Sequence, residues 1–240
     1  MRDEINLHDK DAGPCPFCEI AECVPAGDPV GDSTNYHFEG PSYRSSKTAA
    51  STTSKNPKCS SDRITACFEA YNVVLSTPSH VVILDYQPLV SAAAHLLLFP
   101  RSHVETAAEY ANRPSSVQNS RELTDIGPLF SILAAALGNV FGLHNLNIVS
   151  NNGPAAGQTV PHLHFHIVVR NSETSANDPN YSQFFIPTNN AGSRRTKALY
   201  QSVLYGRGPR TDLDLSQAKH LCSQLHSYLH SHYWLSRARI

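Results

Sequence analysis

The sequence predicts an α+β fold, in which an antiparallel sheet of about five strands packs with two main helices and a C-terminal helix. Short runs rich in Val, Ile and Leu, each bounded by turn residues, predict the strands. The first two runs, 71–77 and 80–86, are separated only by Pro78 and Ser79, which is the pattern of a β-hairpin. Strands and helices then follow one another without regular β–α–β alternation, and this favours antiparallel pairing.

The remaining elements follow in order along the chain. Further strands are predicted at 95–100, 146–151 and 162–169, and helices at 103–111, 121–141 and 214–232. Pro100 ends the third strand, and Pro128 limits where the regular part of the long helix begins. The last helix is amphipathic, because its apolar residues recur at helical spacing: Leu215, Ala218, Leu221, Cys222, Leu225 and Leu229.

The chain divides into three predicted parts. Residues 1–14 are charged and polar and are expected to form a flexible tail, 15–170 a folded domain, and 171–240 a C-terminal extension that carries the last helix. Within the domain, residues 24–62 are dense in Ser, Thr, Gly, Pro and Asn, so a disordered insertion is expected there.

Composition limits the classes of function. The chain has 240 residues, 40% of them hydrophobic, which suffices for one sizeable core. A net charge of −1 gives no global signal for a nucleic acid or an anionic membrane as partner. No run of apolar residues approaches the roughly 18 of a membrane-spanning helix. The charged start does not resemble a secretory signal, so a cytoplasmic or nuclear location is expected, with the six cysteines reduced or bound to metal.

The stretch "VPHLHFHIVVR" places His162, His164 and His166 at every second position. Successive side chains of a strand point to opposite faces, so the three imidazoles are expected to share one face. Three interpretations follow: a solvated polar face, a metal site, or a nucleophilic histidine supported by its neighbours. Burial of the face without partners for three polar rings would be costly, which favours a functional site.

The loop before this strand, "NNGPAAGQT", bears on the choice. Asn151, Gln158 and Thr159 are uncharged hydrogen-bond donors, and Gly153 and Gly157 allow close approach of the backbone. Such donors beside a row of histidines suit an anion, of which phosphate is the usual one.

The run "HLHFHIV" resembles the motif that defines the histidine triad (HIT) superfamily of nucleotidyl hydrolases and transferases. Further segments are similar to that family: "VVILDYQPL", "HLLLFPRSHVETAAE", "NIVSNNGPAAGQTVPHLHFHIV" and, as in fungal members, "LYGRGPRTDLDLSQA". The resemblance implies a HIT-like fold with the HIT domain at 15–170. It also places the chain near the zinc-containing fungal branch related to adenosine 5′-monophosphoramidases.

The resemblance also implies roles for individual residues. His164 would attack the α-phosphorus of a nucleotide and form a nucleotidyl-histidine that water then hydrolyses. His166 would contact the phosphate, and so would Asn151, Gln158 and Thr159. Asp85 would accept both ribose hydroxyls. The base is expected to lie against the 80–86 strand, with Val82 and Leu84 as its contacts.

Cys15 and Cys18 form a Cys-x-x-Cys pair, which by itself is compatible with redox chemistry, metal binding or chance. Resemblance to the zinc-binding HIT branches adds His103 and His162 and predicts a structural zinc site of four ligands. In the alternative, the cysteines are reduced and pack under the sheet while His162 orients His164. Cys23, Cys59, Cys67 and Cys222 are expected to be unpaired thiols.

The chain departs from the family pattern after Asp85. His95 comes later than usual, and Ala94 replaces a glycine whose turn often needs a positive φ, so a different loop path is expected near the nucleoside.

The first functional hypothesis is a hydrolase of nucleoside phosphoramidates or dinucleoside polyphosphates. The alternative is a HIT-like enzyme of fungal secondary metabolism that catalyses a non-hydrolytic step, such as cycloaddition of a terpenoid or polyketide. A third is a nucleotide- or metal-binding module without turnover. By analogy, a homodimer with a small-molecule substrate is expected.

Overall fold

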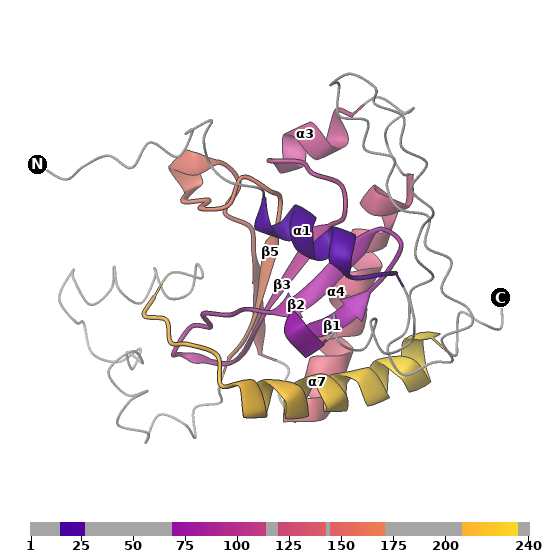
Figure 1. Ribbon diagram of the computed structural model, residues 1–240, viewed down its shortest axis with the longest axis vertical. Coiled ribbons are helices and arrows are strands. Elements are labelled where there is room, and N and C mark those ends of the chain that lie inside the picture. Colours follow the sequence, from indigo (N-terminus) through magenta and orange to yellow (C-terminus); the bar gives the residue numbers. More distant parts are fainter. Residues whose placement is uncertain (1–14, 27–68, 114–119, 143–144, 171–207, 235–240) are drawn as a thin grey trace, which may run out of the picture.

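The computed structural model describes residues 15–26, 69–113, 120–142, 145–170 and 208–234. Its centre is one antiparallel sheet of five strands in the order β1-β2-β3-β5-β4 (Figure 1). The strands are β1 Val73–Ser76, β2 His80–Leu84, β3 Ala92–Pro100, β4 Leu146–Val149 and β5 Phe165–Arg170. The predicted α+β fold and the β1–β2 hairpin are therefore confirmed.

The helices cover the two faces of this sheet. They are α1 Pro16–Cys23, α3 Ala107–Ala111, α4 Ser120–Phe141 and α7 Leu215–Leu229, with a short 3₁₀ turn at Pro154–Ala156 and a π-helical turn at His230–Trp234. In Figure 1, α1 crosses in front of the strands, α4 lies behind them, and α7 runs along the bottom.

Two apolar clusters divide the sheet side chains by face. On one face, Leu96, Leu98 and Ile167 pack with Leu133 of α4 and Leu225 of α7. The other face packs against α1 through a second cluster, which contains Phe17, Ile20, Val81, Ile83, Leu97 and Phe99. Strand alternation thus sends neighbouring residues into different cores, and the α1 face is the one that carries the histidines.

The segment before α7 is joined to the loop after β2 by backbone pairing. Leu89 and Arg210 form an antiparallel bridge. The backbone N–H of Val90 donates to the carbonyl of Pro209 at 3.0 Å, and that of Thr211 donates to Pro88 at 3.1 Å. The C-terminal residues that precede α7 are therefore an integral border of the nucleoside end predicted from the sequence.

Several boundaries differ from the predicted ones. β5 begins at Phe165, so only His166 of the histidine row lies in the paired strand, and the other two precede it in extended chain. β3 begins at Ala92, because the three alanines continue the strand. The helix predicted at 103–111 is confined to Ala107–Ala111. Ala94 is not among the positive-φ residues of the described chain, so it fits this strand without strain.

The helix α4 contains Pro128 in its interior, whereas the sequence predicted that the proline would limit its regular part. Its segment Leu123–Phe141 is long and apolar enough to cross a membrane by length and composition alone, contrary to the expectation from the sequence. Leu129, Leu133 and Leu137 of this segment are buried against the sheet, and a core helix passes the same test.

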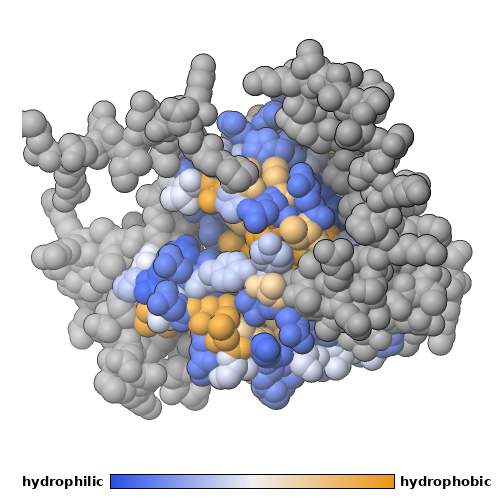
Figure 2. All heavy atoms as spheres, viewed as in Figure 1, coloured by the Kyte–Doolittle hydropathy of each residue, from blue (hydrophilic) through white to orange (hydrophobic). Residues whose placement is uncertain are grey.

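On the face shown in Figure 2, apolar patches alternate with hydrophilic groups. The predictions for the 1–14 tail, for most of the 24–62 insertion, for the first part of the C-terminal extension and for Cys59 and Cys67 lie outside the described residues. Cys23 and Cys222 are free thiols, as predicted.

Candidate functional site

The three histidines of the row lie together under α1, in the interior of the molecule. Their exposed fractions are 0% for His162, 5% for His164 and 6% for His166. The rings of His164 and His166 are 5.1 Å apart between centroids. This burial excludes the solvated strand face and leaves a site in which each ring nitrogen needs a partner.

The tautomer of His164 is fixed by the chain itself. Its Nδ1 lies 2.7 Å from the carbonyl oxygen of His162, which can only accept, so Nδ1 carries the proton. The Nε2 of the neutral ring therefore keeps its lone pair. Burial lowers the pKa of His164 below its usual value, and the hydrogen bond to His162 opposes this only in part. Phe17 of α1 covers the ring at a centroid distance of 5.2 Å.

His166 is oriented by His95, a residue of β3. The Nε2 of His95 lies 2.9 Å from Nδ1 of His166. The backbone N–H of Leu89 donates to Nδ1 of His95 at 3.3 Å, so the proton of His95 sits on Nε2 and points to His166. The Nε2–H of His166 is then directed into the site as a donor. Burial lowers the pKa of His166 to about 3 and that of His95 to about 3 as well.

Asp85 follows β2 and lies at the far end of this row. Its Oδ1 accepts the backbone N–H of Gln87 at 2.9 Å, and its Oδ2 accepts Nη1 of Arg210 at 2.8 Å. Nδ1 of His95 is 3.3 Å from the same Oδ2, but His95 is neutral near pH 7, so this contact is not an ion pair. Arg210 provides the charge that balances Asp85.

The predicted phosphate loop contains both bound and available donors. The amide of Gln158 is occupied internally: it accepts from Gly153 N–H and donates to the carbonyls of Glu105, Val160 and His162. Gln158 thus holds the loop, and its role toward phosphate stays a prediction. Gly153 and Gly157 have φ values of 93° and 86°, which favour glycine. Within the described chain, no hydrogen bond is recorded for the side chains of Asn151 and Thr159.

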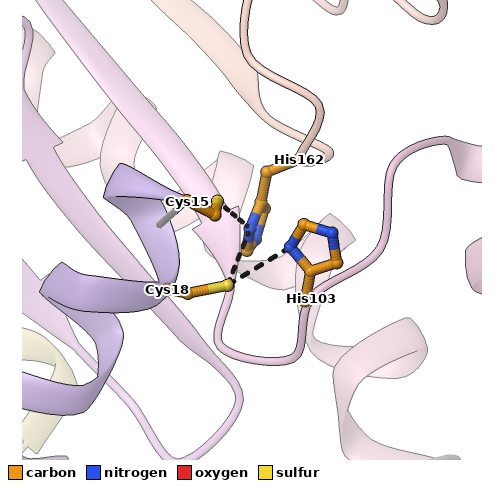
Figure 3. A group of neighbouring side chains, drawn as sticks. All are labelled: Cys15, Cys18, His103 and His162. Atoms are coloured by element: carbon orange, nitrogen blue, oxygen red, sulfur yellow. Dashed lines mark hydrogen bonds between the residues drawn. The ribbon is translucent and has the colours of Figure 1, made fainter. Parts of the chain in front are cut away.

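The second group is formed by Cys15, Cys18, His103 and His162, which meet where α1 begins (Figure 3). Their ligand atoms all lie within 4.8 Å of one another. Nδ1 of His162 is 3.4 Å from Sγ of Cys15 and 3.6 Å from Sγ of Cys18, and Nδ1 of His103 is 3.2 Å from Sγ of Cys18. Zinc bonds of about 2.3 Å to sulfur and 2.0–2.1 Å to nitrogen give tetrahedral S–N edges of about 3.5 Å, so the arrangement fits this ion.

The protonation of this group also suits a cation. The hydrogen bond from Cys18 lowers the pKa of Cys15 to about 2, while the neighbouring Cys15 thiolate raises the pKa of Cys18. One thiolate is therefore present near pH 7 without metal. Nε2 of His162 lies 2.9 Å from the carbonyl of Pro100 and must donate to it, which turns the Nδ1 lone pair toward the sulfurs.

Arg101 and Phe17 are residues of the site that sequence reasoning missed. The buried guanidinium of Arg101 donates to the carbonyls of Ala21 and Val24 at 2.7 Å each, and to Thr77 at 2.7 Å. It thereby joins the C-terminal end of α1 to β1. Position 101 falls within the Pro-x-x-His turn and Phe17 within the Cys-x-x-Cys pair, but neither spacing indicates what the variable residues contact.

The predicted contacts of the base at Val82 and Leu84 are wrong. Both side chains are buried in the cluster with α4 and α7, on the face opposite the histidines. The residues of β2 on the histidine face are Val81 and Ile83. A cavity of about 920 Å³ lies on the α7 side and is bordered by Leu84, Ala94 and Leu213 among others. Of the hydrogen-bonded pair His95 and His166, only His95 lines this cavity.

Known proteins are similar to this chain in sequence. A family model described as HIT domain matches residues 69–173. Adenosine 5′-monophosphoramidase of Saccharomyces cerevisiae is 32% identical over 102 residues, which are 42% of this chain and 56% of that protein. An uncharacterised HIT-like protein of Chlamydia trachomatis is 30% identical over 96 residues, 40% of this chain and 77% of that protein.

Among solved structures, diadenosine triphosphate hydrolase of Plasmodium falciparum in complex with cyclomarin A aligns with a TM-score of 0.43 and 19% identity. The alignment covers 68% of this chain and 79% of that one. The family match and these relatives place the chain in the class of histidine triad proteins. The chain belongs to the HIT superfamily and is related to the fungal adenosine 5′-monophosphoramidases.

Proposed function

We propose that the protein is a HIT-type nucleotidyl hydrolase that cleaves a nucleoside phosphoramidate or a dinucleoside polyphosphate. The observation that carries this proposal is the fixed tautomer of His164, whose Nδ1 donates to the carbonyl of His162 at 2.7 Å. A buried, neutral imidazole with an available Nε2 lone pair is a nucleophile for phosphorus. The relationship to the yeast phosphoramidase supports the same chemistry.

The residues act in two steps. Nε2 of His164 attacks the α-phosphorus and bonds to it, the P–N or P–O bond to the leaving group breaks, and the leaving group takes a proton from solvent water, which the hydrolytic water of the second step replaces. Nε2–H of His166 donates to a phosphate oxygen, with Asn151 and Thr159 as further donors. Water then attacks the same phosphorus, the bond to His164 breaks, and the nucleoside monophosphate is released.

The test is incubation with adenosine 5′-phosphoramidate, with ³¹P NMR for turnover and mass spectrometry after an alkaline denaturing quench that preserves the N–P bond. We expect turnover and an added mass of one AMP, both lost in His164→Asn. His220→Asn changes an exposed histidine of α7 and should retain both signals. Absence of turnover and of any adduct in the wild type would contradict the proposal. Binding of AMP without turnover would point to a binding module.

We also propose that Cys15, Cys18, His103 and His162 hold a structural zinc ion. The support is the edge lengths of 3.2–3.6 Å between sulfur and Nδ1 atoms and the second hydrogen bond of His162 to Pro100. With four protein ligands the ion has no open position, so its contribution is to fix the start of α1 over the row.

Metal analysis of protein purified without chelator tests this site. About one zinc per chain is expected, and His103→Ala and Cys18→Ser should each lower the content. Cys23→Ser removes an exposed thiol of the same helix and serves as the control. Less than about half a zinc per wild-type chain would count against four-ligand coordination.

We favour hydrolysis over the alternative of a biosynthetic enzyme, because a relative is a phosphoramidase and the free Nε2 lone pair of His164 suits attack on phosphorus. We further propose a homodimer, because the edge strand β4 exposes Ile148 and α4 is apolar yet only 28% buried over Leu123–Phe141. The cytoplasmic or nuclear location stays a prediction.

A further inference from the structure

The carboxylate of Asp85 is expected to bind ribose hydroxyls, but in this chain it is also paired with a cation. Oδ1 accepts from the backbone of Gln87, and Oδ2 accepts from Arg210 at 2.8 Å. Two of its roughly four acceptor sites are therefore used, and the two that remain lie beside a guanidinium. The ribose end of the site thus contains a positive group next to the expected diol acceptor.

Arg210 is held in place by the backbone on both sides. Its own bridge to Leu89, together with the hydrogen bonds of Pro209 and Thr211 to the same loop, fixes its Cα relative to Asp85. The segment then continues into α7, where Asp214 caps the helix. An arginine anchored in this way loses little additional freedom when it binds a ligand.

The guanidinium of Arg210 has donors to spare. Both hydrogens of Nη1 are directed at protein acceptors, Oδ2 of Asp85 and the carbonyl of Gln87. Nε and Nη2 have no recorded hydrogen bond to any residue that the structure describes, and the side chain is 32% exposed. These two N–H groups form the edge of arginine that pairs with two oxygens of a phosphate or carboxylate.

We propose that Arg210 makes the ribose end of the site an anion subsite, and that the substrate carries a second phosphate on its ribose. This phosphate would sit on the 2′ or 3′ oxygen, while the 5′-phosphorus reacts at His164. The guanidinium paired with Asp85 offsets the repulsion between that carboxylate and the phosphate. The inference rests on the proposed nucleotidyl hydrolase and specifies its substrate class.

Calorimetry on the full chain at one fixed ionic strength tests the subsite. The probes are AMP, adenosine 3′,5′-bisphosphate and adenosine 2′,5′-bisphosphate. We expect one bisphosphate to bind about tenfold or more tightly than AMP, the size of one charge-assisted pair. Which of the two is preferred identifies the position of the second phosphate.

Variants of Arg210 distinguish the effect of its planar guanidinium on nucleotide affinity from the effect of positive charge alone. Arg210→Gln should abolish the preference for the bisphosphate, and Arg210→Lys, which keeps the charge without the planar fork, should retain only part of it. Lys219→Gln removes an exposed cation of α7 and should leave all three affinities unchanged.

Two results would overturn the inference. One is AMP binding to the wild type as tightly as both bisphosphates. The other is tighter AMP binding by Arg210→Gln than by the wild type, which would mean that the Arg210 side chain blocks the site and must move before a nucleotide binds. If either result is accompanied by turnover of adenosine 5′-phosphoramidate, only this inference fails. If the wild type binds none of the three nucleotides and forms no adduct, the proposed function fails with it.

Discussion

The protonation state of His164 decides whether the proposed site can react. Its Nε2 attacks only as a free base, and burial lowers the pKa of the ring below the usual value of about 6.5. We therefore predict that kcat/KM for a phosphoramidate is level at alkaline pH and falls in acid with a midpoint below pH 6.5. A pH–rate profile with a substrate stable in acid measures this directly.

The control for this profile is the folded state itself, followed by circular dichroism at each pH. A half-maximal rate at pH 7 or above, in protein that is fully folded, would contradict the assignment of His164 as a buried neutral nucleophile. The profile in His220→Asn should match the wild type, since that histidine is exposed on α7.

Among single residues, the sequence predicted those whose positions follow from the alternation of side chains along a strand or from the kinds of residue that bind a metal. His162, His164 and His166 share a buried face as predicted, and the four proposed zinc ligands meet within 4.8 Å. Arg210 could not be predicted, because its partner Asp85 lies 125 positions away and the pairing depends on the C-terminal segment. The choice of Val82 failed for a simpler reason. The sequence alone does not show which alternate residues of β2 lie on the same face of the sheet as the histidines.

The helix α1 carries the proposed zinc ligand Cys18, with Cys15 as its N-cap, and Arg101 joins its far end to the sheet. Arg101 donates to Ala21 of α1, to its C-cap Val24 and to Thr77 after β1. We predict that Arg101→Met lowers the free energy of unfolding by about 2–4 kcal/mol, because it removes charged hydrogen bonds and leaves buried carbonyls without these donors. The same variant should bind zinc more weakly, since α1 is less well fixed.

Urea unfolding and competition with a zinc chelator measure the two effects. Lys219→Met provides the control, because it removes an exposed cation from α7 and should change neither value. A fully stable Arg101→Met protein with unchanged zinc affinity would contradict the role of Arg101 as the residue that positions α1.

At the scale of elements, local patterns predicted the order of strands and helices but misplaced several of their ends. In α7, Ala218, Cys222, Leu225 and Leu229 are buried as the helical spacing predicts. Leu215 is 62% exposed, although it has the same spacing, because the first turn contributes no buried residue. Helical periodicity gives the face of a helix, whereas the length of that face that meets the sheet depends on tertiary packing.

The whole molecule should lose stability in acid because it buries histidines in neutral form. Burial lowers the pKa of His80 to about 4 and those of His95 and His166 to about 3. The unfolded chain binds these protons near pH 6.5, so stability is present above that pH and is lost as pH falls toward the folded pKa values. Each group contributes a slope of about 1.4 kcal/mol per pH unit.

Urea unfolding at pH 7.5 and pH 5.0 measures this loss, which should reach about 2 kcal/mol for each histidine. His80→Gln should reduce the difference between the two pH values by about 2 kcal/mol. His80 hydrogen-bonds Ser79 and does not belong to the proposed zinc group. The change in pH dependence caused by this variant therefore reports protonation of a buried histidine and not loss of the metal. A free energy of unfolding independent of pH over this range would contradict burial of neutral rings.

Association of two chains would cover the surface that the single domain leaves exposed. β4 is an edge strand whose Ile148 is 40% exposed, and unpaired edges invite pairing with another chain. We predict that the wild type is a dimer in light scattering and that Ile148→Glu is a monomer, because two like charges would face each other across a twofold axis. Leu215→Glu places the same charge on another exposed leucine and should remain dimeric. Ile148 is not in the core, so the variant should still fold, and the same mass for both variants would place the interface elsewhere or exclude it.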